Sequence, residues 1–302
     1  MATSNSPCKR ILLYTIVLGF VSVGSALVKL ATWNLLAPQY AGTSKYPWCD
    51  PEYLDWQYRE RLIIPQLLQL DADVVCLQEV QVDLWPDLMS QLEFVYDGVL
   101  QNMTNDHNIA NALLIRKNFP YQIERVESRS RILLAVLRKK SPIPKHMYVA
   151  SVHLEAGIAS DNDLQRYHQI KSIFKRLSHH CQMDGISIHD AAIVLAGDFN
   201  MLRSNIIYQC LSEGQLIHPD DGKNKPPIPT TRLQDVFLMD TRQPVQMTFA
   251  KGYVLDYIWT SNCIGVGKTL CLSPYATQAI PQLWPSQNHP SDHLPIGVEL
   301  IV

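Results

Sequence analysis

The sequence has almost no net charge. Its 26 Lys and Arg residues against 28 Asp and Glu residues give a formal net charge of −2 over 302 residues. The chain therefore lacks the overall positive charge that is typical of nucleic-acid-binding proteins, and any such binding would need a local patch of positive charge. The chain also lacks low-complexity tracts, fixed-period repeats and any leucine-rich or other docking repeat. With 47% hydrophobic residues it can fill a sizeable core, so we expect one globular domain.

One local patch of positive charge lies between residues 116 and 145. Only Glu124 and Glu127 oppose its Lys and Arg residues there, which are Arg116, Lys117, Arg125, Arg129, Arg131, Arg138, Lys139, Lys140 and Lys145. Such a run would hold a polyanion through contacts with its phosphates. The alternative is a solvated edge of two strands, the commoner meaning of a charged run.

The N-terminus carries the pattern of a secretory signal peptide. Two basic residues precede the uncharged stretch Ile11–Val28, and Gly24-Ser25-Ala26 offers small residues for cleavage. We therefore expect residues 1–26 to be a signal peptide and residues 27–302 to form the mature domain, secreted or in the endomembrane system. The alternatives are a signal anchor, since the stretch is just long enough to span a membrane, and a cytoplasmic chain without export.

Cysteines indicate little by themselves. Loss of the signal peptide would leave an even number, which permits disulfides in many pairings. They are Cys49, Cys76, Cys181, Cys210, Cys263 and Cys271. Cys76 lies within an apolar run and is expected to be a buried thiol. One glycosylation sequon, Asn102-Met103-Thr104, fits export.

Short apolar and β-branched runs recur along the chain and predict strands. These runs are Val28–Trp33, Val74–Gln78, Ala112–Arg116, Leu133–Arg138, Tyr148–His153, Ala192–Gly197, Val254–Thr260 and Val298–Val302. Helical spacing predicts Asp55–Leu70 with a kink at Pro65, Leu164–His180, and Asn205–Glu213 ended by Gly214, whereas the proline-rich Asp220–Thr231 predicts a loop. Because some strands follow one another directly and others alternate with helices, the pattern favours an α/β fold of mixed sheets packed face to face with helices outside.

Polar side chains appear where the predicted strands end. They are Asn34, Glu79, His153, Asp198, Asn200, Asp292 and His293, with Asp256 inside a strand-like run. Any one of them has a structural explanation, since Asp and Asn at strand ends start turns or cap helices. Glu79 is harder to explain in that way, because a carboxylate that follows an apolar strand needs a cation or a donor as partner. No Ser or Cys nucleophile elbow competes with this set.

Six short motifs that contain these residues occur in the order typical of one superfamily. Residues 28–302 resemble the endonuclease/exonuclease/phosphatase superfamily through Thr32-Trp33-Asn34-Leu35-Leu36, Cys76-Leu77-Gln78-Glu79-Val80, Ser151-Val152-His153-Leu154, Ala196-Gly197-Asp198-Phe199-Asn200, Leu255-Asp256-Tyr257-Ile258 and Pro290-Ser291-Asp292-His293-Leu294-Pro295. Finer matches resemble its deadenylase, nocturnin and Angel branch. They are Leu36-Ala37-Pro38-Gln39-Tyr40, Tyr46-Pro47-Trp48-Cys49-Asp50, Leu54-Asp55-Trp56-Gln57-Tyr58-Arg59 and Asn288-His289-Pro290-Ser291-Asp292-His293.

This resemblance implies a four-layer α/β sandwich of the deoxyribonuclease type. It also implies Mg²⁺-dependent hydrolysis of phosphodiester bonds, with Mn²⁺ as a possible substitute and single-stranded RNA, degraded from its 3′ end, as the typical substrate. By the same resemblance the metal would be held by Asn34, Glu79 and Asp292, oxygen ligands that suit a hard cation. The remaining residues would activate water or donate to the phosphate: His153, Asp198, Asn200, Asp256 and His293.

The chain departs from that branch at positions that help to form the base pocket. After His153-Leu154 it continues Glu155-Ala156-Gly157-Ile158, where deadenylases have a second His, a Trp and an Asp-Pro. Ile109–Leu114 replaces a Gly-Cys-Ala stretch, and Phe249 is the candidate for the aromatic before Asp256.

Three hypotheses follow from these matches and departures. The first is a 3′-to-5′ exoribonuclease. The second is a hydrolase of the same fold that acts on 2′-5′ oligonucleotides, DNA, dinucleotide phosphates or a phospholipid headgroup such as that of sphingomyelin. The third is an inactive binding module. The sequence leaves the oligomeric state open.

Overall fold

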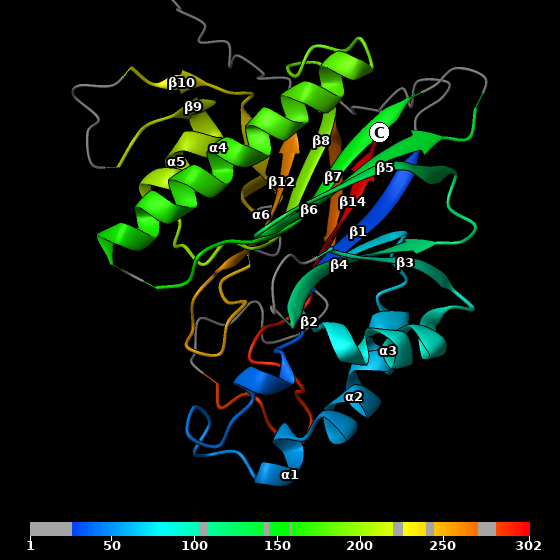
Figure 1. Ribbon diagram of the computed structural model, residues 1–302, viewed down its shortest axis with the longest axis vertical. Helices are drawn as coiled ribbons and strands as arrows, with labels where there is room; N and C mark the ends of the chain where they lie inside the picture. Colours follow the sequence, from blue (N-terminus) through cyan, green and yellow to red (C-terminus); the bar gives the residue numbers. More distant parts are fainter. Residues whose placement is uncertain are drawn as a thin grey trace, which may run out of the picture.

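Two six-stranded mixed sheets lie at the centre of this computed structural model, which describes residues 26–102, 108–141, 145–157, 159–219, 226–239, 245–270 and 282–302 (Figure 1). The first sheet has the order β13 (Gly265–Leu270), β14 (Ile296–Ile301), β1 (Leu27–Asn34), β2 (Val74–Gln81), β4 (Ile109–Arg116), β3 (Tyr96–Leu100). The second has the order β11 (Leu233–Asp235), β12 (Asp256–Ser261), β8 (Ala192–Asp198), β7 (His146–His153), β6 (Ile132–Lys139), β5 (Tyr121–Arg129). Each sheet contains one parallel pair, β1 with β2 and β7 with β8.

Helices join and cover these sheets. They are α1 (Pro51–Leu54), α2 (Trp56–Gln69), α3 (Trp85–Leu92), α4 (Ser160–Met183), α5 (Ile206–Glu213) and α6 (Val236–Met239), with 3-10 turns η1 (Pro38–Tyr40) and η2 (Val82–Leu84). Parallel neighbours need a crossover connection. Accordingly, α2 lies between β1 and β2 in the chain, and α4 lies between β7 and β8.

Local sequence explains where the helices begin and end. The Asp55 side chain accepts from the backbone N–H of Gln57 at 2.8 Å and caps α2, which continues through Pro65. The Asn205 side chain caps α5 through the N–H of Ile207 at 2.9 Å. Gly214 ends α5 with a φ of 71°, a left-handed conformation that favours glycine.

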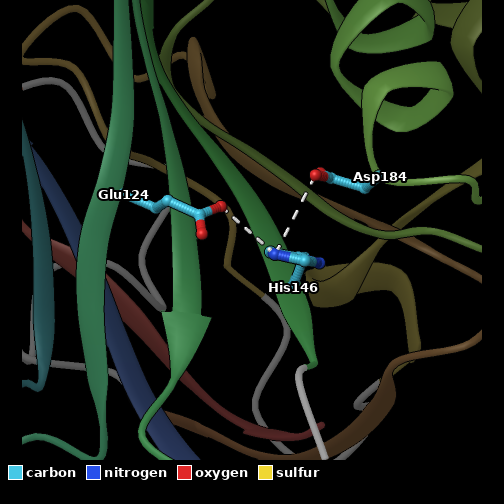
Figure 2. A group of neighbouring side chains, drawn as sticks. All are labelled: Glu124, His146 and Asp184. Atoms are coloured by element: carbon cyan, nitrogen blue, oxygen red, sulfur yellow. Dashed lines mark ion pairs between the residues drawn. The ribbon is translucent and has the colours of Figure 1, made fainter.

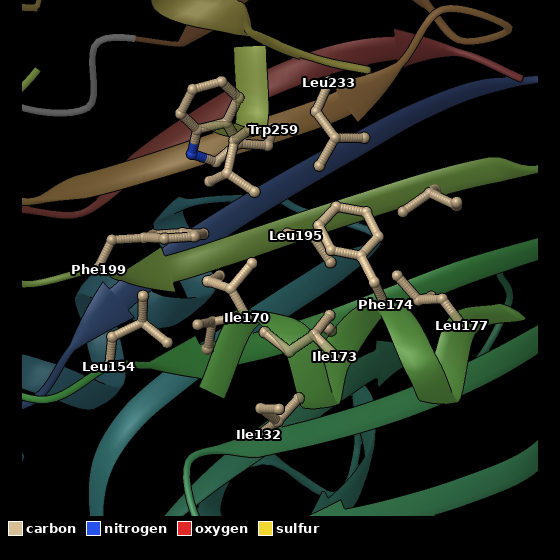
Figure 3. Close-up of a cluster of buried hydrophobic side chains, with 14 of the residues drawn as sticks. Ile132, Leu154, Ile170, Ile173, Phe174, Leu177, Leu195, Phe199, Leu233 and Trp259 are labelled. Atoms are coloured by element: carbon tan, nitrogen blue, oxygen red, sulfur yellow. The ribbon is translucent and has the colours of Figure 1, made fainter. Parts of the chain in front are cut away.

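Three hydrophobic cores separate four layers. Alternate residues of β1 face opposite ways: Leu30 belongs to the core between the two sheets, whereas Ala31 belongs to the core under α2 and α3. The third core lies between the second sheet and α4, where Ile170 and Phe174 pack with Leu195 of β8 and with other apolar side chains (Figure 3). Figure 1 shows α4 running across the second sheet and α1 to α3 gathered at the far side of the first. The layers are therefore helix, sheet, sheet, helix, which confirms the four-layer α/β sandwich.

The eight predicted strands and three predicted helices are all present, with ends that differ by a few residues. The predicted loop Asp220–Thr231 is wrong in part, because Ile228–Pro229 forms a short strand, β10, paired with β9 (Gln215–Leu216); residues 220–225 lie outside the described residues. Pro229 is tolerated there because this two-stranded sheet leaves both strands at an edge.

The five described cysteines are free thiols. Cys76 is buried, as predicted, and so are Cys49, Cys181 and Cys210. Cys8 and Cys271 lie outside the described residues, as do residues 1–25 of the expected signal peptide and two residues of the sequon. Within the described ranges, no helix combines the length and apolar character needed to cross a membrane.

Candidate active site

The two parallel strand pairs bring their carboxyl ends to one edge of the sandwich. Asn34 is the last residue of β1 and is paired with Gln78 of β2, next to Glu79. His153 and Asp198, the last residues of β7 and β8, are partners in the parallel ladder. Four predicted site residues from two sheets therefore meet at this edge.

The Asn34 side chain links the carboxylates of the two sheets. Its Nδ2 donates to Glu79 Oε1 and to Asp198 Oδ2, both at 3.1 Å. Its Oδ1 accepts from the backbone N–H of Leu36 at 3.0 Å. Because Asn34 is fully buried, this amide holds the two carboxylates at a fixed separation.

Glu79 occupies an irregular point of β2. The ladder with β4 shifts register between Leu77 and Val80, and Glu79 has a φ of 55°, which is uncommon for a residue other than glycine. Its side chain, only 12% exposed, accepts from Asn34 and from the N–H of Ala37 at 3.0 Å. Burial and the nearby Asp292 carboxylate raise the pKa of Glu79. Backbone strain of this kind is typical of functional sites.

His293 lies between two carboxylates. Its Nδ1 is 2.8 Å from Asp256 Oδ2, and its Nε2 is 3.6 Å from Asp198 Oδ2. Burial alone would lower the pKa of His293, but the charges of Asp256 and Asp198 raise it above the ordinary range. For the Asp198 carboxyl, by contrast, burial raises the pKa, and the positive charge of His293 opposes that rise. The imidazole is therefore oriented by Asp256 to present Nε2 towards Asp198.

His153 is held in the neutral form. Its Nε2 lies 3.9 Å from Glu79 Oε1 and 3.8 Å from Asp198 Oδ2, distances that would be ion pairs only if the ring were protonated. Burial and the charges of Arg131 and His293 lower the pKa of His153 to about 3. At neutral pH it is therefore an uncharged donor facing the two carboxylates.

Asp292 reaches the same site from the loop before β14. Its Oδ2 accepts from the Tyr46 hydroxyl at 2.6 Å, and Lys45 Nζ lies 3.7 Å from the same oxygen. Burial and Asp292 raise the pKa of Tyr46, so this hydroxyl remains a donor. Tyr46, 246 residues away in sequence, thus fixes one oxygen of the carboxylate.

Asn200 is placed by its backbone and its side chain together. Its N–H donates to Asp198 Oδ1 at 2.9 Å, and its side-chain Nδ2 donates to the Leu154 carbonyl at 3.1 Å. It has a φ of 50°, a left-handed conformation that Asn tolerates better than most residues. All eight predicted residues thus belong to one site.

The donor set fits a divalent cation better than a histidine-rich metal centre. Among the described residues, no Lys or Arg lies within ion-pair distance of Glu79, although Asp292 stands nearby. The carboxylate oxygens of Glu79 and Asp292 are of the kind that Mg²⁺ prefers, whereas the Asn34 amide oxygen is turned towards the N–H of Leu36. Asp198, Asp256 and His293 also lie close enough to share an ion. We interpret them instead as an ion-pair series, because Nδ1 of His293 is hydrogen-bonded to Asp256 and Nε2 faces Asp198.

A polar bridge behind the site ties the sheets together. Gln78 Nε2 donates to Ser151 Oγ at 3.0 Å, and Ser151 Oγ donates to the Leu77 carbonyl at 2.9 Å. These groups are fully buried, so they fix the position of β2 relative to β7.

A cleft of about 630 Å³ opens beside His153. Its lining contains Tyr40, Arg129, Arg131, Glu155 and seven amide side chains, namely Gln39, Gln101, Asn102, Asn108, Asn111, Gln165 and Gln169. We call it the amide cleft. Ile109 and Ala110 are the apolar residues of its lining. Such a surface suits a ligand rich in hydrogen-bonding groups.

The basic run divides into two parts. Arg129 and Arg131 line the amide cleft, and Arg131 is also paired with Glu155 at 2.7 Å. Other members form ion pairs along strand edges, such as Arg116 with Asp71 at 2.7 Å. The interpretation as a charged strand edge is therefore confirmed for these members. Arg129 is also paired, with Glu127 at 2.7 Å, so an anionic ligand in the cleft would meet two arginines that already have carboxylate partners.

Figure 2 shows a second group of titratable side chains at the other end of β7: Glu124, His146 and Asp184. His146 Nε2 lies 3.2 Å from Glu124 Oε2 and 3.9 Å from Asp184 Oδ1. However, Arg125 donates to Asp184 at 2.5 Å, and Arg138 Nε lies 3.8 Å from Glu124. Two guanidinium groups already balance the two carboxylates, so we interpret this group as an ion-pair network.

Several residues at the site were not predicted from the sequence as functional. Tyr46 and Arg59 lie in the segments that resemble the deadenylase branch, and their position in those motifs was the available signal. Arg166 of α4 gave no signal, because an arginine in an amphipathic helix is expected to face solvent. Phe249, the candidate aromatic, lies against His293 with ring centroids 4.8 Å apart.

Comparison with known proteins identifies the family of the chain. The model of the Endonuclease/Exonuclease/phosphatase family matches residues 31–293. The chain is 27% identical to 2′,5′-phosphodiesterase 12 of Homo sapiens over 91% of its own length and 52% of that protein. It is 24% identical to nocturnin of Xenopus laevis over 88% of its length and 70% of that protein. The chain thus spans about half the length of the 2′,5′-phosphodiesterases it matches.

Solved structures share the fold. The crystal structure of ANGEL2, a 2′,3′-cyclic phosphatase, in complex with adenosine-2′,3′-vanadate superposes with a TM-score of 0.73 and 21% identity, covering 93% of this chain and 97% of that one. The human nocturnin catalytic domain with bound sulfate gives a TM-score of 0.64 and 20% identity, covering 91% and 95%. Because the family model matches most of the length of this chain, the chain belongs to the endonuclease/exonuclease/phosphatase family.

Proposed function

We propose that this chain is a divalent-metal-dependent phosphodiesterase that hydrolyses RNA or short oligonucleotides. The observation that carries the proposal is the joining of Glu79 and Asp198 through Asn34, beside His293 and the amide cleft. This arrangement combines a cation site, an oriented imidazole and a polar substrate surface. Retention of all eight predicted residues argues against an inactive binding module.

Asn34, Glu79 and Asp292 would hold Mg²⁺ or Mn²⁺, which offsets negative charge on a scissile phosphate when bound. Asp198, fixed by Asn34 and by the N–H of Asn200, is placed to orient an attacking water and accept its proton.

His293, held by Asp256, and neutral His153 are placed to donate to phosphate oxygens as negative charge builds there. Attack in line with the leaving oxygen would invert the configuration at phosphorus.

The amide cleft favours nucleotides over lipids. Amide side chains match the edges of bases and the hydroxyls of ribose, whereas a lipid site would need a larger apolar surface. Among oligonucleotides, 2′-5′ linkages form the second candidate, because the human relative with 27% identity is a 2′,5′-phosphodiesterase by name. We propose 3′-to-5′ hydrolysis of single-stranded RNA as the first.

A substrate panel tests the proposal. Purified protein with Mg²⁺ would be given 3′-5′-linked oligoadenylate, 2′-5′-linked oligoadenylate, mixed RNA, single-stranded DNA and sphingomyelin. We expect stepwise shortening of RNA from its 3′ end; preference for the 2′-5′ linkage would select the second candidate, and preference for sphingomyelin would refute both.

Glu79→Gln is the matched inactive variant, because it keeps the shape of the side chain and removes its charge. Loss of the metal contribution should reduce the rate on the order of 1,000-fold. Equal activity of the two proteins would contradict the mechanism, and circular dichroism would show that the variant is folded.

We also propose that residues 1–26 are a cleaved signal peptide. The uncharged run and the small residues before Leu27 support this. N-terminal sequencing of the protein from its native source should give Leu27 as the first residue, whereas an intact N-terminus would contradict cleavage.

A further inference from the structure

Arg59 of α2 is a fully buried arginine that binds backbone carbonyls. Its Nη1 donates to the carbonyls of Leu35 at 3.0 Å and Pro290 at 2.8 Å. Its Nη2 donates to the Leu36 carbonyl at 2.8 Å, and its Nε donates to the Leu54 carbonyl at 3.2 Å. One guanidinium thus joins three separate segments of the chain.

Two of these segments carry the ligands proposed for the metal. Leu35 and Leu36 directly follow Asn34, and Pro290 lies two residues before Asp292. Ser291 Oγ also donates to the Asn34 carbonyl at 2.7 Å, within the same junction. The separation of Asn34 from Asp292 therefore depends on where Arg59 holds the two backbones.

The charge of Arg59 needs an explanation beyond packing. Among the described residues no carboxylate lies within ion-pair distance of it, and burial lowers its pKa to about 10, so it remains charged at neutral pH. Asp292 and Glu79 are close enough for their charges to oppose that lowering. A buried guanidinium without an ion pair is costly, and an apolar side chain would cost less if only packing mattered.

We propose that Arg59 is a positioning residue for the divalent-metal site, an inference that rests on the proposed function. It fixes the backbone segments that carry Asn34 and Asp292, so that these ligands are held in position before the metal binds. Residues that orient metal ligands act on affinity for the ion as well as on catalysis.

Metal affinity of the whole chain tests the role directly. Mn²⁺ binding would be measured by electron paramagnetic resonance for wild type, Arg59→Lys and Arg59→Met. Arg61→Met is the matched control, because Arg61 lies two residues further along the same helix and is exposed. We expect the dissociation constant for Mn²⁺ to rise about 10-fold to 100-fold in Arg59→Met, less in Arg59→Lys, and not in Arg61→Met.

The alternative is that Arg59 only stabilises the loops. In that case Arg59→Lys would lower the melting temperature of the metal-free protein and leave its Mn²⁺ affinity unchanged, which would overturn the proposal. The Lys variant keeps a buried charge and several donors, so it carries the test if the Met variant does not fold. Wild-type protein that binds no Mn²⁺ would also overturn it. Tight Mn²⁺ binding without hydrolysis of any substrate would refute the proposed function alone.

Discussion

The two crossover units of the molecule are built alike and are charged differently. In the first, β1, α2 and β2 supply Asn34 and Glu79; in the second, β7, α4 and β8 supply His153 and Asp198. Each unit thus places its site residues at the carboxyl ends of a parallel pair, where ligands usually bind in α/β sheets.

Each crossover helix also carries a buried arginine that binds backbone carbonyls at the site. Arg166 of α4 donates to the carbonyls of Glu155 at 2.5 Å, Asn200 at 3.1 Å and Gly157 at 3.0 Å. It is also paired with Asp163 at 2.7 Å, whereas Arg59 has no such carboxylate. The second unit therefore neutralises its own arginine. The first unit holds its arginine on backbone carbonyls alone, so the role proposed for Arg59 leads us to expect that metal affinity depends more on the first unit than on the second.

The largest effect is expected at Asp256 of β12, which lies outside both crossover units. Asp256→Asn keeps the shape of the side chain but removes the charge that orients His293. We expect kcat to fall by about 100-fold or more, the usual effect of removing one preorganised donor. Mn²⁺ affinity, measured by electron paramagnetic resonance, should stay within about twofold of wild type, because the ligands of the first unit are intact.

A double-mutant cycle sharpens this prediction. Asp256→Asn should add little in a His293→Gln background, since the two side chains act as a unit. Fully additive losses would show that Asp256 acts by some route other than His293.

The sequence was sufficient to predict the strands that carry the site. The structure explains why other elements could not be predicted in the same way. The runs ending in Asn34 and Asp198 are largely apolar because both faces of their sheets are covered, and such runs are easy to recognise. By contrast, β5 was missed because Gln122, Glu124 and Glu127 interrupt its apolar residues, a pattern that an outermost strand with little cover permits. Edge strands need fewer apolar side chains.

The arginines escaped prediction for a different reason. Arg59 and Arg166 lie in helices that carry other charged residues, so apart from the motif that contains Arg59, nothing local distinguishes them from solvated side chains. Their partners are backbone carbonyls, which every residue possesses and no sequence pattern reveals. The distance from Arg59 to Pro290 in the chain is 231 residues, so only the folded structure brings the two together.

A smaller effect is expected at Arg166. Arg166→Met removes the donor that fixes the carbonyl of Asn200, and it leaves Asp163 without that partner. We expect kcat to fall about 10-fold through misplacement of Asn200 and Asp198, with Mn²⁺ affinity unchanged. The comparison with Arg59→Met is the informative one: if both variants lost Mn²⁺ affinity equally, the division between the units would be wrong. Lys175→Met, an exposed change on the same helix, is the control.

The smallest effect is expected in the amide cleft. Arg131 lines this cleft and is 35% exposed, so Arg131→Gln should raise KM for RNA only several-fold. It should also reduce the slope of log KM against log salt concentration by about one, because one phosphate contact is lost. Arg138→Gln is the matched control, because Arg138 belongs to the same basic run but does not line the cleft. Steady-state kinetics at several salt concentrations measure both. If the two variants changed the slope equally, the contribution of Arg131 would be a long-range effect of charge, and the cleft would not be where the phosphates bind. A slope that changes for Arg131→Gln alone would place the RNA backbone along the amide cleft.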